Sequence, residues 1–410
     1  MSFILLKNYT FQGANKKNTT YDLEVVNSKS SEVVVFMHGY MGYKDWGCWN
    51  LVQDYFIVHG LNFAKFNVSH NGTTVDNPKE FTDLESFSIN SYKRELDDLK
   101  VFINHLKVAY HLDKIHLIGH SRGGGIVLLS ANNPSVQTVS TWASICSVDE
   151  RMKKGTELKE WKEAGFYYTK NGRTNQEMPH SYSQYEEFRA NEDILNIEQS
   201  CIELKKPICV IHGVEDSSVS IIEGEQIASW TNSKLIKIDD TNHTFGASEP
   251  WDGNELPLAL KQVCEQTLRF IKTEGAKLSQ MNERNGLLAE LIKMADADNS
   301  IRDMEFQFLL SISSQMGVTK DDFKELFEQH IEFQPPKLEF ERIVQFQRLV
   351  LLMNVDMEIA ATEMTYIKDL GIRMGLNPMA TNEVLNVMQN YPNKVVPPDV
   401  LIQIFRTFHN

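Results

Sequence analysis

The sequence has few cysteines, fewer basic than acidic side chains, and no long apolar run. Its five cysteines are widely spaced and form no Cys-x-x-Cys pair. This excludes a scaffold held together by disulfides and predicts reduced thiols in the core of a cytoplasmic protein. No stretch approaches the roughly 20 apolar residues of a membrane span, and the apolar run at the N-terminus is too short for a secretory signal. We therefore expect a cytoplasmic protein with no membrane span.

The charge balance is acidic, because 41 lysines and arginines stand against 55 aspartates and glutamates, a formal net charge of −14. Such a chain is unsuited to non-specific binding of nucleic acid, so we expect no nucleic-acid partner. The remaining composition, 42% apolar and 23% charged, is that of an ordinary globular protein. Since 410 residues exceed one ordinary domain, we expect two.

Up to about residue 275, short runs of β-branched and aromatic residues alternate with longer amphipathic stretches. One such stretch, 88–110, places Leu96, Leu99 and Phe102 on a single helical stripe. Alternating strands and helices predict an α/β fold, with a mostly parallel sheet and helices on both of its faces. The expected strands are 32–37, 62–66, 115–118, 139–143, 208–211 and 234–238.

The interval 150–206 interrupts this alternation of strands and helices, since it is far longer than an ordinary connection between two secondary-structure elements. It contains a charged helical stretch, 151–164, and a hairpin-like segment around Asn171-Gly172. We interpret this insertion as a lid over a binding site, and its aromatic side chains as the lid's own small core or as a surface for an apolar acyl group.

From residue 282 to residue 410 every periodic stretch is helical, which predicts a second, all-α domain after the 1–275 domain. The polar stretch 273–282 is either a linker or a helix. An internal repeat with an offset of 58 residues pairs Asp298 with Asp356 and Glu305 with Glu363. The repeat indicates two related helical hairpins.

The segment Gly119-His120-Ser121-Arg122-Gly123 is a Gly-x-Ser-x-Gly motif between a buried strand and an apolar helix. In that setting the motif predicts a sharp turn that raises the serine hydroxyl above the sheet. Glycines are needed on both sides because a side chain there would collide with neighbouring backbone. We therefore interpret Ser121 as a catalytic nucleophile, the alternative being a tight turn without chemistry.

A serine nucleophile needs a base and an acid that orients the base. Asp216 and His243 directly follow two expected strands, so both lie at the sheet edge where Ser121 stands. We interpret His243 as the base and Asp216 as the acid. The acids that compete with Asp216 for this role are Glu215, Asp239, Asp240 and, after the preceding strand, Asp149.

Two backbone N–H groups are also needed to stabilise an oxyanion. We assign one to Arg122, the residue after the nucleophile, and the other to Tyr40, in the loop after strand 32–37. His38, in the same loop, is expected to brace the loop. No cluster of histidine, cysteine or carboxylate in residues 1–275 has the spacing of a catalytic zinc site, so we expect no cofactor for catalysis.

Together these motifs resemble the α/β-hydrolase superfamily, and within it the dienelactone-hydrolase-like and cinnamoyl-esterase-like serine hydrolases, over about residues 20–275. The resemblance implies a Ser-His-Asp esterase with a lid inserted after the strand that follows the nucleophile helix. It departs in two places: dienelactone hydrolases have a cysteine nucleophile, and the loop after Asn67 lacks the Asp-x-Arg-Gly-x-Gly pattern of many relatives. The matching segments are His38-Gly39, Gly119–Gly123, His212–Asp216 and Asn242–Phe245.

Residues 282–410 resemble the TerB-type (tellurite-resistance-associated) helical domain through the acidic residues of the repeat. Asp298, Glu305, Asp356 and Glu363 could bind a divalent cation together. The alternative is that they cap helix N-termini. Asp296-Ala-Asp298 opens like an EF-hand loop, but Ile301 replaces the required glycine and Gln307 the required glutamate, so it is not an EF-hand.

These features predict a hydrolase of carboxylic esters, with a small-molecule ester as substrate and an acyl-enzyme on Ser121. The same triad would also serve a peptidase or amide hydrolase. A third hypothesis is a catalytically idle adaptor, in which the acidic helical domain binds a protein partner.

Overall fold

The computed structural model describes residues 4–297, 301–327, 331, 333, 335–336, 338–355 and 360–408, without the side chains of residues 278 and 279. The chain forms two compact units, Met1–Gly275 and Ala276–Asn410. The first unit is an α/β structure, and the second is helical in the part that is described.

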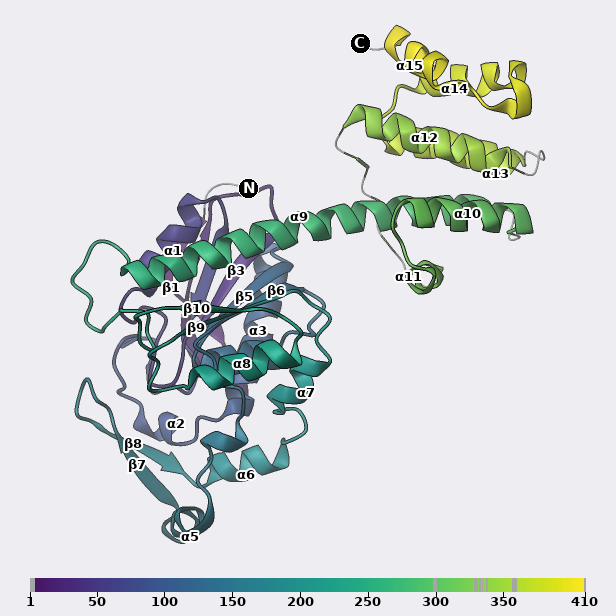
Figure 1. The fold of residues 1–410 in the computed structure, drawn as a ribbon. Helices are drawn as coiled ribbons and strands as arrows, with labels where there is room; N and C mark the ends of the chain where they lie inside the picture. The colour runs from purple at the N-terminus through teal and green to yellow at the C-terminus, as the bar shows by residue number, and fades with distance from the viewer. Residues whose placement is uncertain are drawn as a thin grey trace. The chain divides into compact units, whose positions relative to one another are not determined.

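The first unit is built on an eight-stranded sheet with the order β1-β2-β4-β3-β5-β6-β9-β10 (Figure 1). From β4 to β10 every neighbouring pair is parallel, whereas β1 and β2 form an antiparallel hairpin whose second strand pairs with β4. The mostly parallel sheet predicted from the sequence is confirmed. The strands are β1 (Ile4–Gln12), β2 (Asn18–Val25), β3 (Glu32–Met37), β4 (Asn62–Phe66), β5 (Lys114–His120), β6 (Val136–Trp142), β9 (Ile208–Gly213) and β10 (Leu235–Ile238).

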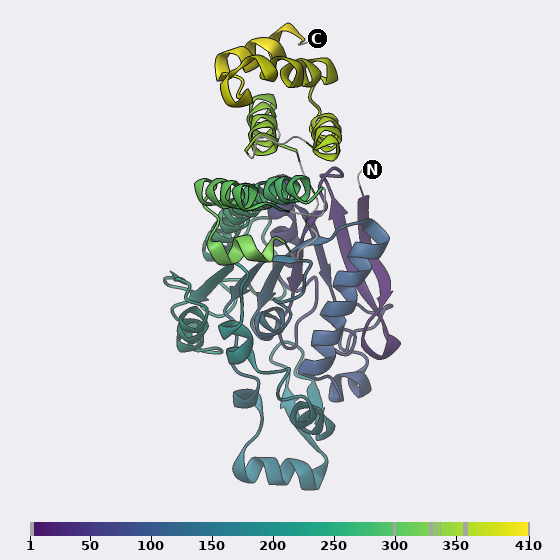
Figure 2. The ribbon, with the colours of Figure 1, turned by 90° about the vertical axis from the view of Figure 1, so that its right-hand side faces the viewer.

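Helices cover both faces of this sheet (Figures 1 and 2). Alternate residues of β3 show how the faces divide: Val33 and Val35 belong to one apolar core, and Val34 and Phe36 to the other. The first core also contains α3 (Tyr92–Tyr110), α4 (Arg122–Leu129) and α8 (Ile221–Trp230). The second contains α1 (Trp49–Val58) and the first half of α9 (Leu258–Ala295).

The helix expected over 88–110 is α3, which begins four residues later, at Tyr92, and a separate short helix, α2 (Leu84–Ser88), precedes it. Ser91 separates them, because its backbone is extended and its Oγ accepts a hydrogen bond from the N–H of Arg94 at 3.2 Å. This is N-terminal capping of α3, which starts the helix at Tyr92.

The insertion between β6 and β9 contains a short 3-10 turn, Asp149–Arg151, and then helix α5 (Gly155–Ala164). A two-stranded hairpin follows, β7 (Phe166–Lys170) paired with β8 (Glu177–Ser181). The expected hairpin is thus present, although its turn runs over 171–176. Helices α6 (Ser183–Ala190) and α7 (Ile197–Ile202) complete the insertion, which we call the lid. Helix α5 is the part of the lid that lies farthest from the sheet (Figures 1 and 2).

The second unit encloses a core of its own, which includes Leu288, Leu309, Phe346 and Ile367. The repeat seen in the sequence has a structural counterpart, because α10 and α13 are each followed by a glycine with positive φ, Gly317 and Gly375. Its helices are the end of α9, α10 (Asp303–Gln315), α11 (Lys320–Glu325), α12 (Glu339–Met353), α13 (Ala361–Arg373), α14 (Pro378–Val387) and α15 (Pro398–Thr407), with two 3-10 turns, 388–390 and 392–394.

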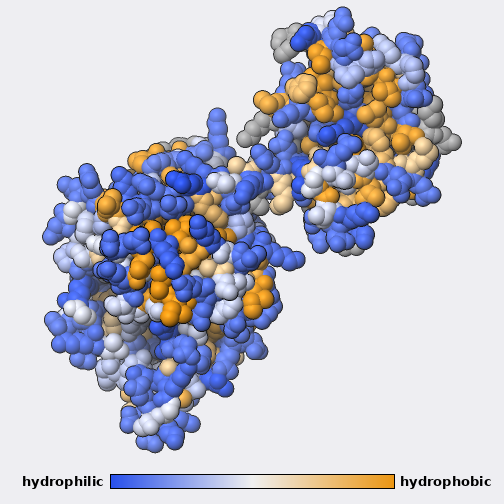
Figure 3. Space-filling view, in the orientation of Figure 1, coloured by the Kyte–Doolittle hydropathy of each residue, from blue (hydrophilic) through white to orange (hydrophobic). Residues whose placement is uncertain are grey.

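Helix α9 runs without interruption through the polar stretch 273–282, so the helical alternative for that stretch is the correct one. Apolar side chains are visible on the surface of each unit, among a majority of hydrophilic ones (Figure 3). Among the described residues, no helix is both long and apolar enough to cross a membrane. All five cysteines are buried and free.

Candidate active site

Ser121 occupies a strained turn between the end of β5 and the start of α4. Its backbone has φ 57° and ψ −122°, a conformation that L-residues rarely adopt. A Cβ at Gly119 would lie 2.4 Å from the carbonyl oxygen of Gly123, and a Cβ at Gly123 would lie 2.5 Å from that of His38. The turn therefore tolerates only glycine at these two positions.

His243 and Asp216 form a hydrogen-bonded pair. His243 Nδ1 lies 2.7 Å from Oδ2 of Asp216, and the Asp216 carboxylate is closed to solvent. Its other oxygen accepts hydrogen bonds from the N–H groups of Ser218 at 2.8 Å and Val219 at 2.9 Å. Burial alone would raise the pKa of Asp216, but hydrogen bonds from His212, His243 and Val219 outweigh it and hold the pKa well below its usual range.

The competing acids lie elsewhere. The side chain of Asp149 is 58% exposed and pairs with Lys154 at 2.9 Å. Glu215, Asp239 and Asp240 are exposed. In the described part of the chain Asp216 is the one carboxylate bonded to the imidazole of His243.

Two further histidines hold this pair, and neither was predicted from the sequence. Fully buried His212 places Nε2 3.2 Å from Asp216 Oδ2 and 2.9 Å from the Val219 carbonyl, so this nitrogen carries the proton. His120 Nε2 lies 2.9 Å from the His243 carbonyl, with the two rings 4.8 Å apart. The contact of His212 with Asp216 could have been inferred from the sequence, because the two residues are four positions apart at the end of an expected strand.

The loop after β3 passes directly beside Ser121, since a Cβ at Gly39 would lie 2.9 Å from the Ser121 Cβ. His38 holds the base of the loop. Its Nε2 accepts from the N–H of Val68 at 3.3 Å, which leaves the Nδ1 proton for the Gly39 carbonyl at 2.9 Å. Burial lowers the pKa of His38 to about 4, so the ring is neutral at physiological pH and acts as a brace.

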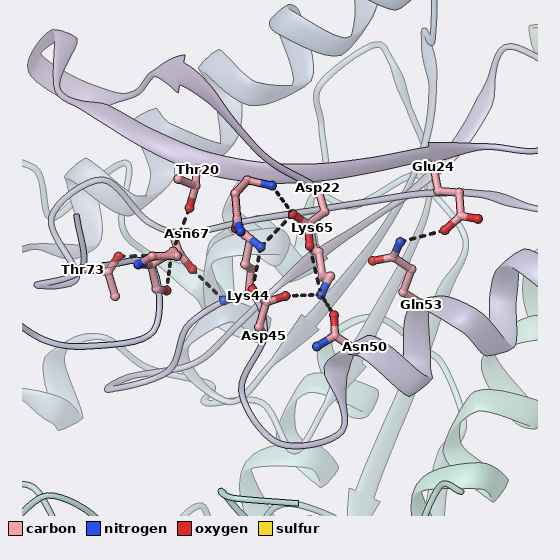
Figure 4. Close-up of polar contacts among 12 residues, drawn as sticks. Thr20, Asp22, Glu24, Lys44, Asp45, Asn50, Gln53, Lys65, Asn67 and Thr73 are labelled. Atoms are coloured by element: carbon pink, nitrogen blue, oxygen red, sulfur yellow. Dashed lines mark hydrogen bonds and ion pairs between the residues drawn. The ribbon is translucent and has the colours of Figure 1, made fainter. Parts of the chain in front are cut away.

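The same loop is anchored further along by a buried charge cluster of Asp22, Lys44, Asp45 and Lys65 (Figure 4). Lys44 Nζ lies 2.7 Å from Asp22 and 2.6 Å from Asp45, and Lys65 Nζ lies 2.6 Å from Asp45 and 3.3 Å from Asp22. Because Asp22 is on β2 and Lys65 on β4, the cluster fixes the loop to two strands of the sheet.

No family model matches the chain, and no curated protein matches it. Solved structures do match. Est1E from Butyrivibrio proteoclasticus, with ferulic acid bound, has a TM-score of 0.50 at 15% identity, over 65% of this chain and 99% of Est1E. The first unit has the α/β-hydrolase fold. Two further structures are similar. Mouse α/β-hydrolase domain-containing protein 10 has a TM-score of 0.48 at 17% identity, over 68% of this chain and 100% of the mouse protein. A dienelactone hydrolase from Anabaena variabilis has a TM-score of 0.44 at 14% identity, over 67% of this chain and 99% of that hydrolase.

In this α/β-hydrolase fold, a cavity of about 510 Å³ opens beside Ser121 and His243. Tyr40 and Arg122 also line it, so the structure brings four of the five site residues predicted in this unit to one cavity, with Asp216 directly behind His243. The other lining residues are Tyr92, Ile145, Arg151, Met152, Lys153, Trp161, Tyr167, Thr169, His180, Gln184, Ser218 and Val219.

The lid contacts the loop after β3 across this cavity. The Tyr40 hydroxyl lies 2.8 Å from Nε2 of His180 on β8, and the Tyr167 ring stacks on His180 with centroids 4.5 Å apart. Burial lowers the pKa of His180 to about 4, so its ring is neutral at physiological pH. The lid thereby supplies aromatic walls to the cavity and a polar contact to the Tyr40 loop.

The acidic residues of the repeat are only partly described. Asp298 and Asp356 lie outside the described residues. The carboxylate of Glu305 accepts from the N–H of Arg302 at 2.7 Å, and that of Glu363 from the N–H of Ala360 at 2.9 Å. Both contacts are the helix capping that the sequence offered as one alternative. Cation binding by these residues stays a prediction.

Proposed function

We propose that the first unit is a serine hydrolase that cleaves carboxylic esters with Ser121 as nucleophile, His243 as base and Asp216 as orienting acid. The observation that carries the proposal is the 2.7 Å contact between His243 and buried Asp216, with His243 and Ser121 lining one cavity. Nucleophile, base and orienting acid are the three parts that acyl transfer through a serine requires.

In the proposed reaction, Ser121 Oγ attacks the ester carbonyl while its proton passes to Nε2 of His243. The hydrogen bond to Asp216 occupies Nδ1, which fixes the tautomer that leaves Nε2 free to accept. The protonated imidazole then donates to the departing alcohol oxygen, which leaves an acyl group on Ser121. Water deprotonated by the same nitrogen attacks the acyl-enzyme and releases the acid.

For the oxyanion we propose the backbone N–H groups of Arg122 and Tyr40. Arg122 is the first residue of α4, where helix N–H groups have no partner within the helix and the helix dipole favours negative charge. The loop that carries Tyr40 is held next to Ser121 by His38 and by the Lys44 cluster, so its donor needs little rearrangement during the reaction.

A fluorophosphonate probe tests the proposal, because it labels only an activated serine. We expect labelling of the full chain, and none in Ser121→Ala or His243→Ala. Chromogenic esters and matched anilides then distinguish the ester hydrolase from the second candidate, an amide hydrolase with the same triad. Absence of labelling in a folded protein would favour the adaptor hypothesis.

For the second unit we propose a role outside the chemical steps, because every group invoked above belongs to the first unit. The TerB-type resemblance, a protein partner for this unit and a cytoplasmic location remain predictions.

A further inference from the structure

The cavity beside Ser121 is cationic in an acidic protein. Arg122, Arg151 and Lys153 line it, and among its described lining residues there is no aspartate or glutamate. The whole chain has a net charge of −14. The composition therefore gives no reason to expect a positively charged wall at this place.

Arg122 is the cation next to the proposed nucleophile. Its guanidinium lies over the Tyr92 ring, 3.8 Å from the centroid, and 5.9 Å from that of Tyr40. Its Nε lies 2.9 Å from Oε1 of buried Glu95, an ion-pair contact without hydrogen-bond geometry, and Glu95 accepts a hydrogen bond from the side-chain amide of Asn90 at 2.7 Å. Within the described part of the chain, no acceptor is bound to the terminal N–H groups of Arg122.

The charge on Arg122 persists in this environment. Burial alone would lower the pKa of Arg122, but Glu95, Tyr92 and Tyr40 outweigh it and raise the pKa overall. The guanidinium offers its remaining donors in a planar fork, the geometry that matches both oxygens of a carboxylate.

The other two cations belong to the lid side of the cavity. Arg151 pairs with Glu223, whose second oxygen accepts from the Cys146 N–H at 2.9 Å. Lys153 pairs with Glu157 at 3.2 Å, with side chains 37% and 66% exposed. An exposed pair of this kind contributes little energy, so Lys153 can readily turn toward an anion in the cavity.

We propose that the substrate is an ester that carries an anionic substituent on its acyl or alcohol part, bound by the terminal N–H groups of Arg122 with Lys153 as a second cation. This inference rests on the proposed ester hydrolysis. The carbonyl oxygen of a neutral ester is assigned to the backbone N–H groups of Arg122 and Tyr40, so its apolar substituents would cover the side-chain donors of Arg122 without giving them an acceptor, which is unfavourable. An anionic oxygen would accept charge-assisted hydrogen bonds from them.

Three phenyl esters test the proposal. Phenyl valerate is neutral. Phenyl hydrogen glutarate has a carboxylate in place of the terminal methyl group of the acyl chain, and 4-carboxyphenyl valerate has its carboxylate on the leaving group. For the full chain we expect kcat/KM to be at least tenfold higher for one carboxylate ester than for phenyl valerate, and the better one identifies the side on which the anion lies.

Variants then assign the effect. Arg122→Met combined with Glu95→Gln removes both charges of the buried pair and keeps the backbone N–H of residue 122. The ratio of the kcat/KM values for the carboxylate ester and phenyl valerate should fall about tenfold to about a hundredfold. Glu95→Gln alone should keep or raise the ratio, since Arg122 then lacks its counter-ion. Lys237→Met removes an exposed cation outside the cavity and should leave the ratio unchanged.

If the ratio of the kcat/KM values is near one in the wild type, or is unchanged in the double variant, the proposal of an anionic substituent is overturned. The proposed hydrolysis would still stand if phenol release depends on Ser121. If no ester is cleaved, the proposed function fails by itself, and calorimetry on Ser121→Ala tests the anion site directly. One of the two carboxylate esters should bind at least tenfold more tightly than phenyl valerate, and equal affinities of all three esters would refute the site.

Discussion

His243 Nδ1 and Asp216 Oδ2 are 2.7 Å apart, and the aspartate side of this contact is shielded from water while the imidazole remains 18% exposed. The carboxylate receives hydrogen bonds on both of its oxygens, from His243 and His212 on one and from backbone N–H groups on the other. A charged group held in this way orients the imidazole and stabilises its cation.

Asp216→Asn should reduce kcat/KM for activated esters by about 10³- to 10⁴-fold, because an amide cannot hold the catalytic tautomer of His243. The measurement is ester turnover together with the rate of fluorophosphonate labelling. Asp149→Asn is the matched control, and it should change both by less than about twofold, as Asp149 is exposed and paired with Lys154. A larger loss in the control would transfer the acid role to Asp149.

The value of kcat/KM should rise with pH, because the proposed base must be a free imidazole to act. A protonated His243 cannot accept the proton of Ser121. His120, His38 and His180 do not contribute, since burial lowers the pKa of His120 to about 3 and the pKa values of His38 and His180 to about 4. They remain neutral across the range from about pH 5 to about pH 9, where activity can be measured. A flat profile, with chemistry as the limiting step, would argue against a histidine base.

Because Ser121 has a positive φ, replacing it with glycine should raise the stability of the protein and abolish its activity. The free energy of unfolding in urea should be about 1–2 kcal/mol higher for Ser121→Gly than for Ser121→Ala, because glycine adopts this backbone conformation without strain. Both variants should be inactive, and Ser121→Ala should match the wild type in stability. Equal stability of the two variants would show that the turn stores no strain.

Lys65→Met should destabilise the first unit by about 3–5 kcal/mol, since it leaves buried Asp22 and Asp45 with one cation between them. The exposed change Lys237→Met is the control, and it should have almost no effect on urea unfolding. Burial alone would raise the pKa of Asp45, but Lys65 and Lys44 hold it low, so the cluster's stabilisation is present at neutral pH and is lost as the pH falls. The variant should lose less stability on acidification than the wild type.

Residues 1–276 alone should fold and hydrolyse esters within a few-fold of the full-chain rate. Helix α9 contributes Leu260, Val263 and Leu268 to a core of the first unit, and Leu288 and Leu291 to the core of the second. A break after residue 276 therefore leaves each core its own side chains. Circular dichroism and ester turnover measure the outcome. A folded but inactive fragment would mean that the second unit completes the active site.

Much of the first unit could be read from the sequence because its signals are local. The glycines around Ser121 report a turn that excludes side chains, and Asp216 and His243 directly follow buried strands. The β1–β2 hairpin gave no such signal. β1 is a largely exposed edge strand, and β2 is buried on both faces, so neither shows the alternation of a half-buried strand.

The walls of the cavity could not be predicted for a different reason. Tyr92, Arg151 and Tyr167 come from α3, the start of the lid and β7, so their meeting depends on how the lid folds over the sheet. The pairing of Arg122 with Glu95 joins residues 27 positions apart on two helices and follows from the packing of α3 and α4. Periodicity identifies each helix, but it does not specify which polar side chains meet between helices.

Burial of the five cysteines should make their thiols unreactive toward electrophilic reagents. Burial raises the pKa values of Cys48, Cys146, Cys201 and Cys209 to about 12, and that of Cys264 also lies well above its usual range. With a pKa near 12, about one thiol in 10⁵ is ionised at pH 7, and the thiolate is the form that attacks electrophiles. Acylating and alkylating reagents should therefore leave all five cysteines untouched. A cysteine introduced on the lid, at exposed Tyr168, would then carry a fluorophore or spin label without background.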